Sequence, residues 1–431
     1  AGIVSLLRLG EIAEKQETRQ PLELSEAAMP ENPKTSKTAS RIYRQIVETY
    51  PESPLSEVAL LKLAGLQKRR KDYENCIDTL KELLAKHPDT QLKDQVEQVM
   101  RQATVDLAAR YRAEGHYEKS VDTMAMVKAQ YPDAQFTLET VQGLAESLAH
   151  VLEEKRDGEG AKSVVGYYEK RKELIVPTEM PEVALIVGMA CKELYLCEYA
   201  ISMLSSARKS YPDERWPAEH LLALGECGYR EKKYKLATEV LERFISLHPR
   251  YSQVSRAHLW LGNMSVTQAK HKKALALYER GLERAADQQS RSRLLAAMGK
   301  ALNGIGDHNR AITVFSQALS ILEGQSSGVG DTDTRFTVYK QLGETYFKTG
   351  DNKKAVVAFE QALQVMPKGM DGYGLQFEIA KCYQSIAPQK AETVLNDIVA
   401  SGDPFWSKVA QAQINDIDME RSVGTLGLNK S

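Results

Sequence analysis

One stretch of the sequence, residues 339–367, has the pattern of two helices packed against each other. In its first half, apolar side chains recur every three or four residues, which predicts a helix with one apolar face. Gly343 lies on that face, where glycine costs about 1 kcal/mol relative to alanine, so we expect a second helix to approach closely there. Gly350 begins a predicted turn, and Pro367 ends the second helix. The stretch therefore predicts a helical hairpin.

The same spacing recurs along the chain. Gly343 is followed by alanine, a bulky residue and alanine at offsets of 12, 16 and 19 residues. We call the first small residue of each series the anchor, and four earlier glycine anchors lie 37 residues apart. The glycine anchors are Gly188, Gly225, Gly262, Gly299 and Gly343, and alanine takes their place further upstream at Ala64, Ala108 and Ala149. We expect each anchor to face the bulky residue 16 positions later, namely Leu80, Met124, Val165, Leu204, Leu241, Tyr278, Phe315 and Phe359.

Small and bulky residues in this order resemble the tetratricopeptide repeat, a helical hairpin of about 34 residues. The resemblance covers roughly residues 39–400 and is strongest over 299–367. It implies an all-α fold, a right-handed α-solenoid of antiparallel helix pairs, whose surface binds other proteins. It implies no catalytic residues.

The repeats predict a single array over residues 1–431, with about nine hairpins and a C-terminal capping helix. The Gly/Ser-rich segment 324–334 is expected to be a mobile loop, with Asp331 and Asp333 as helix caps, and Asp157–Gly160 is expected to be a second acidic cap. The array is divided into an irregular first repeat at 1–51 with an inserted loop at 18–37, degenerate repeats at 52–180, regular repeats at 181–367, a last hairpin at 370–400, the capping helix at 404–419 and a disordered tail at 421–431.

Charge and motifs exclude several classes of function. The 57 basic and 58 acidic residues nearly cancel, so no long-range field for nucleic acid or an anionic membrane is expected. No apolar run reaches the roughly 18 residues that a membrane-spanning helix needs. The five cysteines contain no Cys-x-x-Cys pair and the eight histidines no His-x-x-x-His pair, so we predict no metal site, no cofactor and no enzyme activity.

The sequence gives conflicting indications of the cellular compartment. The chain begins Ala1-Gly2 rather than with methionine, and we expect a fragment or a processed form. A Tyr-Pro pair followed by a small or acidic residue, as in residues 50–64, resembles repeats of bacterial envelope-assembly lipoproteins and related periplasmic proteins. That resemblance favours the bacterial periplasm or cell envelope over the cytoplasm. An odd number of cysteines points instead to a reducing compartment, and Cys76, at a small-residue position, is expected to be a core thiol.

The resemblance also implies where a partner binds. In this family the concave surface is lined mainly by first helices, at positions one, four and five beyond the anchor. Only fragments of the Lys/Asn/Arg pattern that clamps a C-terminal carboxylate are present, at Asn263 and Lys300. We expect an acidic partner segment, extended or helical, along the regular repeats. The predicted partner-binding residues are Lys192, Glu226, Tyr229, Arg230, Asn263, Lys300, Asn303, Glu344, Phe347 and Lys348.

These observations favour a non-enzymatic scaffold or adaptor for protein partners, with a role in assembly of a bacterial envelope complex. Two alternatives stay open. One is a structural protein that self-assembles through the ends of its arrays, although a polar capping helix argues against open-ended stacking and favours a monomer. The other is the regulatory part of a larger protein whose other domain lies outside this chain.

Overall fold

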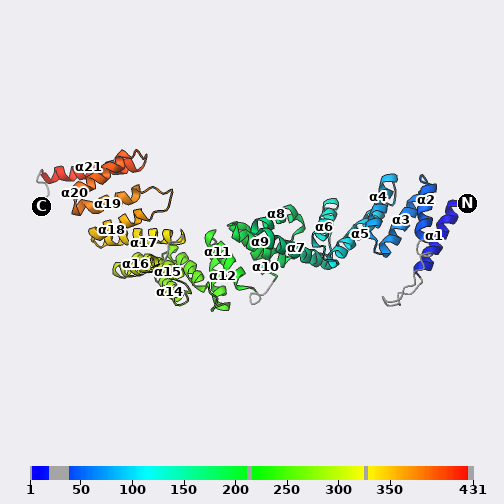
Figure 1. Ribbon diagram of the computed structural model, residues 1–431, viewed down its shortest axis with the longest axis horizontal. Helices are drawn as coiled ribbons and strands as arrows, with labels where there is room; N and C mark the ends of the chain where they lie inside the picture. The colour runs from blue at the N-terminus through cyan, green and yellow to red at the C-terminus, as the bar shows by residue number, and fades with distance from the viewer. Residues whose placement is uncertain (1, 19–37, 211–215, 325–328, 426–431) are drawn as a thin grey trace. The chain divides into compact units, whose positions relative to one another are not determined.

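The protein is an all-α helical repeat protein. The computed structural model describes residues 2–18, 38–210, 216–324 and 329–425, and these residues contain no strand. Consecutive helices of the described chain pair into ten hairpins, from α1–α2 to α19–α20, and a single helix, α21, follows them (Figure 1). The described chain thus has one hairpin more than the expected nine.

The chain divides into two compact units, residues 1–213 and 214–431, each of which is described by itself. The single array over 1–431 therefore stays a prediction. Unit 1 contains α1 (Gly2–Thr18), α2 (Thr38–Thr49), α3 (Pro54–Arg69), α4 (Tyr73–Lys86), α5 (Lys93–Ala113), α6 (Tyr117–Gln130), α7 (Leu138–Glu159), α8 (Ala161–Arg171), the short 3-10 helix η1 (Lys172–Leu174), α9 (Pro181–Glu193) and α10 (Cys197–Arg208).

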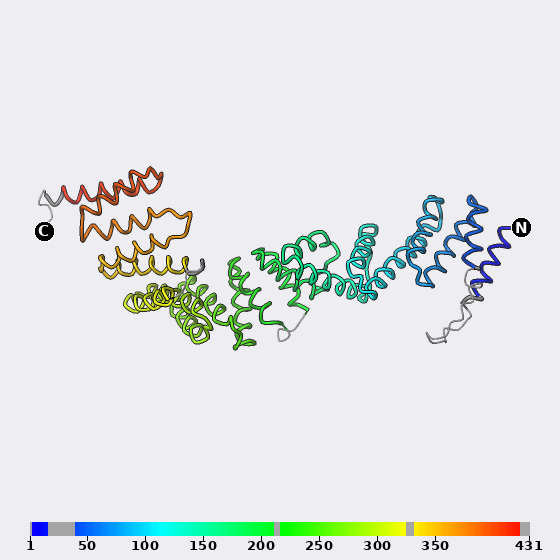
Figure 2. The backbone as a smooth tube through the Cα atoms, in the orientation of Figure 1, coloured from blue at the N-terminus to red at the C-terminus, as the bar shows by residue number. Residues whose placement is uncertain are grey.

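Unit 2 begins at the first helix of the sixth hairpin. Figure 2 traces the up-and-down course of the chain through its hairpins. The helices of unit 2 are α11 (Ala218–Arg230), α12 (Tyr234–Leu247), α13 (Val254–Thr267), α14 (His271–Glu283), α15 (Gln288–Gly304), α16 (His308–Glu323), α17 (Val329–Lys348), α18 (Asn352–Gln364), α19 (Tyr373–Ile386), α20 (Pro388–Ala400) and α21 (Trp406–Thr425).

Each glycine anchor lies where the two helices of its hairpin cross. A β-carbon built on Gly343 would lie 2.7 Å from Phe359 Cδ1, far inside the 3.5–4.0 Å of an ordinary carbon contact. Any larger residue there would displace the ring, so the expected pairing of anchor and bulky residue is confirmed. The same close approach joins Gly188 to Leu204, Gly225 to Leu241, Gly262 to Tyr278 and Gly299 to Phe315.

The turn inside most hairpins repeats one backbone conformation. Seven residues after the anchor, a residue with φ between 57° and 81° reverses the chain. The next amide donates to the carbonyl five residues earlier, as Asp351 N does to Tyr346 O at 2.9 Å, which is the bond that closes a left-handed helix end. The seven turn residues are Lys71, Gly115, Tyr195, Lys232, Ala269, Gly306 and Gly350.

Stacking of the hairpins buries the faces that a single hairpin leaves exposed. Within each unit, the second helix of one hairpin packs on the first helix of the next, as α14 does on α15 and α16 on α17. First helices also contact one another, so that α11, α13, α15 and α17 form a continuous row in unit 2. This row carries the candidate site.

The start of α17 and the end of α21 differ from the sequence predictions. Because α17 begins at Val329, part of the loop expected at 324–334 is helix, and Asp333 lies inside that helix rather than capping it. α21 continues to Thr425, so the tail expected at 421–431 is helical in its first five residues. Residues 19–37 of the predicted loop, residues 211–215, residues 325–328 and residues 426–431 lie outside the described residues.

The hairpin α7–α8 corrects a further expectation. Leu148 and Val164 are fully buried, whereas the predicted pair Ala149 and Val165 is only half-buried. The chain turns at Gly160, eleven residues after Ala149 and five before Val165, rather than seven after and nine before as in the glycine-anchored hairpins, so the expected spacing does not hold in α7–α8. Helix α7 runs through Asp157 to Glu159, and α8 has no side-chain cap, so the expected acidic cap at 157–160 is absent from this turn.

Candidate partner-binding groove

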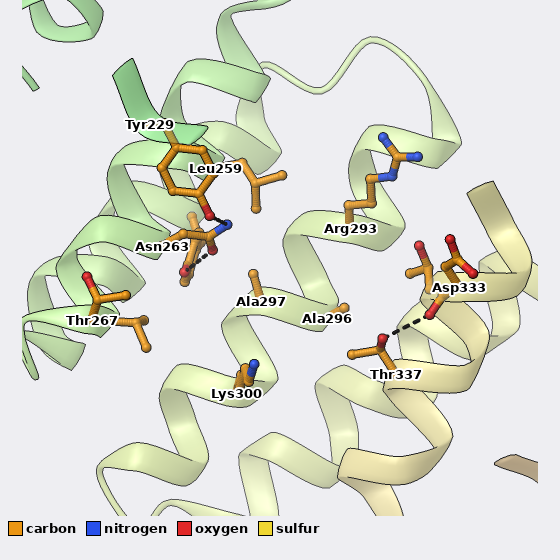
Figure 3. A pocket seen from close by; sticks show the side chains of 13 residues that line it. Tyr229, Leu259, Asn263, Thr267, Arg293, Ala296, Ala297, Lys300, Asp333 and Thr337 are labelled. Atoms are coloured by element: carbon orange, nitrogen blue, oxygen red, sulfur yellow. Dashed lines mark hydrogen bonds between the residues drawn. The ribbon is translucent and has the colours of Figure 1, made fainter. Parts of the chain in front are cut away.

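Three of the predicted binding residues meet in one cavity of about 440 Å³ on the row of first helices in unit 2. Figure 3 shows it from close by, with α15 as its floor between α13 and α17. We call this cavity the central groove. Its main residues are Tyr229 from α11, Leu259 and Asn263 from α13, Arg293, Ala297 and Lys300 from α15, and Asp333 and Thr337 from α17.

The floor of the central groove is one face of α15. Arg293, Ala296, Ala297 and Lys300 follow each other at offsets of three, four and seven residues, which places them on the same side of a helix. The two alanines leave space between the neighbouring helices because their side chains end at the β-carbon. Arg293 and Lys300 stand at the two ends of this face, on either side of the alanines (Figure 3).

A chain of hydrogen bonds fixes the α13 side of the central groove. The Tyr278 hydroxyl donates to Asn263 Oδ1 at 2.8 Å, and Asn263 Nδ2 donates to the Tyr229 hydroxyl oxygen at 3.3 Å (Figure 3). Tyr278 is 1% exposed, and burial raises the pKa of its phenol, which keeps it a neutral donor. Tyr229 accepts in this chain, so its own hydroxyl proton can be donated to a bound group.

The charge of the groove lining is positive. It contains the cations Arg293 and Lys300 and one carboxylate, Asp333. Neither cation forms an ion pair within the part of the chain that the structure describes, and both are exposed. On the α17 side, Thr337 Oγ1 donates to the backbone oxygen of Asp333 at 2.9 Å and leaves the carboxylate at the edge of the groove.

A second cavity of about 450 Å³ adjoins the central groove and shares Leu259 and Arg293 with it. We call it the arginine cavity, after Arg230, Arg256 and Arg293 in its lining. The predicted residue Glu226 is 5% exposed and lies beneath two of these arginines. Its carboxylate accepts from Arg230 Nη2 at 2.9 Å and lies 3.7 Å from Arg256 Nη2.

The other predicted residues lie outside both cavities, so their roles in binding stay predictions. Asn303 joins two first helices, because its Nδ2 donates to Thr345 Oγ1 at 2.7 Å. Glu344 accepts from Gln341 Nε2 at 2.7 Å. The ring of Phe347 lies 5.1 Å from Lys381 Nζ. Lys348 is exposed at the end of α17, and Lys192 belongs to unit 1.

Sequence reasoning missed Arg293, Ala297, Asp333 and Thr337. It considered only positions after the anchor, whereas Arg293 lies six residues before Gly299. A helix of 17 residues such as α15 presents the same face on both sides of its anchor. The same helix face, extended upstream of the anchor by about three turns, includes these residues.

The described residues hold no group of three His, Cys, Asp or Glu side chains that could bind a metal ion. Nor does any helix among them combine the length and apolar character needed to cross a membrane. All five cysteines are buried free thiols, and burial raises the pKa of the Cys76 thiol to about 11. The expectation that Cys76 is a core thiol is confirmed.

Comparisons with solved structures return helical repeat proteins. A MamA structure (MSR-1) is 22% identical, with a TM-score of 0.33 over 41% of this chain and 91% of its own. PilF of Pseudomonas aeruginosa is 15% identical, with a TM-score of 0.41 over 55% of this chain and 99% of its own. The C-terminal part of a repeat-containing protein from Cytophaga hutchinsonii is 13% identical, with a TM-score of 0.45 over 60% and 96%. No curated protein sequence matches the chain.

Family models match two of the hairpins. Residues 58–90 and residues 337–368 each match a model described as tetratricopeptide repeat. The second match contains Gly343 and Phe359, the anchor and the bulky residue of the most regular hairpin. With this match, the helical hairpins and the repeated anchor contacts, the chain is a tetratricopeptide repeat protein, and its repeats form a protein-interaction scaffold.

Proposed function

We propose that the central groove holds an extended, acidic segment of a partner protein. The observation that carries this proposal is the lining, in which a floor of two alanines on α15 lies between Arg293 and Lys300. Neither cation forms an ion pair within the described residues, although Arg293 also attracts the carboxylate of Asp287, so a carboxylate of the partner placed near either cation is attracted to it.

The width of the row of first helices, from α11 to α17, sets the length of the partner segment that can bind across it. Neighbouring helices pack about 8–10 Å apart, so a path from α11 to α17 crosses three such steps, roughly 27 Å. An extended chain advances about 3.3 Å per residue, and the path therefore accommodates about eight residues. Tyr229 and Asn263 at one side offer a hydroxyl and an amide to its backbone.

The positions of the two cations favour an extended segment. A segment that crosses α15 over Ala296 and Ala297 has Arg293 on one side and Lys300 on the other (Figure 3). Successive side chains of an extended chain point in opposite directions. Acidic residues at neighbouring positions would then reach both cations at once, whereas a helix would present such neighbours on different faces.

Site-specific photo-cross-linking tests this proposal. A photo-reactive amino acid at Ala297, on the groove floor, should capture acidic peptides of a partner in the native host. The double variant Tyr229→Ala, Lys300→Glu should lose this capture while keeping its helicity. Arg230 is left unchanged because it pairs with the buried Glu226.

The matched control is Lys273→Glu, the same charge reversal at an exposed position of α14, outside the groove. It should leave capture at Ala297 unchanged. Equal losses in the groove variant and in the control would show that general charge, rather than the groove, governs the interaction, and would overturn the proposal.

Envelope assembly and the absence of enzyme activity belong to the same proposal, which describes a non-catalytic scaffold. Their support is the Tyr-Pro sequence pattern and the interaction role of the repeat class. Fractionation of the native host should place the protein with the envelope, and recovery in the cytosol alone would contradict that. Self-assembly is the alternative, and light scattering separates the two, because a monomer of this chain has a mass of 48.1 kDa.

A further inference from the structure

The arginine cavity contains a buried hydroxyl group that the fold does not use. Ser255 is 1% exposed, and its Oγ has no hydrogen-bond partner in the described structure. A buried polar group without a hydrogen-bond partner destabilises a fold. Ser255 lines the arginine cavity, so a bound group with acceptor atoms would supply the missing partner.

The cationic groups around this hydroxyl come from three different helices. Arg230 ends α11, Arg256 lies in the first turn of α13, and Arg293 lies in the second turn of α15. Glu226 contacts the first two from its buried position and holds Arg230 by two hydrogen bonds to one oxygen, at 3.1 and 2.9 Å. Arg256 is also fixed by the ring of Trp260, which lies 5.1 Å from its Cζ.

The charges of the arginine cavity suit an anion. Among the described residues, three arginines face two carboxylates, Glu226 and Asp287, which gives these five groups a net charge of +1. Asp287 already accepts from the amide of Ser290 at 2.7 Å and from its hydroxyl at 2.8 Å. The N-termini of α13 and α15 also lie at this cavity, and each adds about half a positive charge. The sum of about +2 equals the charge that a phosphate monoester carries with opposite sign at neutral pH.

We propose that the arginine cavity is an oxyanion site that takes a phosphate monoester carried by the protein segment in the central groove. The two cavities share Arg293 and Leu259, so a segment that leaves the central groove past Arg293 enters the arginine cavity. Guanidinium groups match phosphate oxygens in geometry and charge, and Ser255 Oγ donates to one of them. The proposal rests on the proposed function for the source of the phosphate, whereas the site itself is tested separately.

Calorimetric titration of the full chain with inorganic phosphate tests the site. We expect saturable binding at one site, and weaker or no binding of acetate at the same ionic strength. Arg293→Gln should weaken phosphate binding about tenfold, because one charge-assisted contact is lost. Lys300→Gln removes the same charge from the same helix but outside the arginine cavity, and should change the affinity less than twofold. Equal effects of both variants, tighter binding of acetate, or no saturable binding would overturn the site.

Ser255→Ala separates a ligand-binding role from a packing role. If the hydroxyl is unsatisfied in the free protein, its removal should leave the melting temperature unchanged or raise it, while phosphate affinity falls at least threefold. An unchanged phosphate affinity would overturn the assignment of Ser255 as a donor and, with it, the placement of the oxyanion in this cavity.

Peptide pools identify the source of the phosphate. Pools of mixed sequence with a central phosphoserine, glutamate or serine are compared for binding to the full chain, to Arg293→Gln and to the control Arg291→Gln, which removes an exposed arginine of α15 outside both cavities. Preference for the phosphoserine pool, lost in Arg293→Gln, supports the proposal. Phosphate binding without such a preference overturns the peptide source and assigns the site to free phosphate. Either result leaves photo-cross-linking at Ala297 as a separate test of the central groove.

Discussion

The hairpins α17–α18 and α7–α8 bring their two helices together in different ways. In α17–α18 the small residue, Gly343, is on the first helix and the bulky residue, Phe359, is on the second. In α7–α8 no glycine contacts the other helix of the hairpin, because a β-carbon built on Gly143 would meet Arg112 of α5 and nothing lies within 4 Å of one built on Gly158 or Gly166. A close glycine crossing is therefore not required in every hairpin.

The turns of the two hairpins also differ in their position along the chain. Gly350 has a φ of 81° and ends the first helix of α17–α18 seven residues after the anchor. In α7–α8 the first helix continues to Glu159, and the left-handed residue is Gly160, twelve residues after Leu148. The close crossing and the position of the left-handed turn thus vary together, and both can be altered by single substitutions.

The largest effect is expected from filling the crossing of α17–α18. Gly343→Leu places a branched side chain where even a β-carbon would lie 2.7 Å from the Phe359 ring, and overpacking of this kind costs roughly 1–3 kcal/mol or more. Gly166→Leu in α8 is the control, because nothing lies within 4 Å of a β-carbon at Gly166. Thermal unfolding followed by circular dichroism should show a lower melting temperature for the first variant only.

A smaller effect is expected from the left-handed turn. Gly350→Ala forces a β-carbon into a backbone with φ of 81°, at a cost of about 1–2 kcal/mol. Gly158→Ala, within helix α7 and with open space around it, should instead stabilise by up to about 1 kcal/mol. Chemical denaturation measures both, and a loss of stability in both variants would show that glycine is needed for another reason.

The smallest expected effect is a gain in stability. Ala269 occupies the left-handed turn of α13–α14 with a φ of 57°. Ala269→Gly should relieve this strain and raise stability by about 0.5–1 kcal/mol after the entropy cost of glycine is subtracted. Hydrogen exchange of the α13 and α14 amides is sensitive to a change of this size, and faster exchange in the variant would contradict the expectation.

The sequence predicted best the contacts between residues of the same hairpin. Gly343 and Phe359 are recognisable because both partners lie within one hairpin at a fixed spacing. The error in α7–α8 arose because the same distance from anchor to turn was assumed for every hairpin, whereas Gly160 lies eleven residues after Ala149 rather than seven. The start of α17 was missed because the sequence before Phe336 is polar and rich in glycine. Arg335 of α17 donates to the backbone oxygen of Leu322 on α16, a contact between two helices that the pattern did not predict.

The candidate site depends on contacts between different hairpins, which a spacing within one hairpin does not specify. Tyr229, Asn263 and Lys300 were predicted from the known use of first helices and do lie together. Arg293 and Asp333 were missed because their positions follow from which helices are neighbours and how far each extends beyond its anchor. The buried position of Glu226 under two arginines was likewise invisible, since Arg256 belongs to the next repeat.

The central claim is that an anchor and the residue sixteen positions later are fitted to each other. A double-mutant cycle with Gly343→Ala and Phe359→Leu measures this directly, because the double variant recreates the alanine and leucine that occupy these positions at Ala64 and Leu80, both fully buried in one core cluster. We predict that Gly343→Ala destabilises the protein when Phe359 is present and costs at least about 1 kcal/mol less when leucine replaces it. Free energies of unfolding that add to within about 0.5 kcal/mol would mean that the two sites are independent, and would contradict the account.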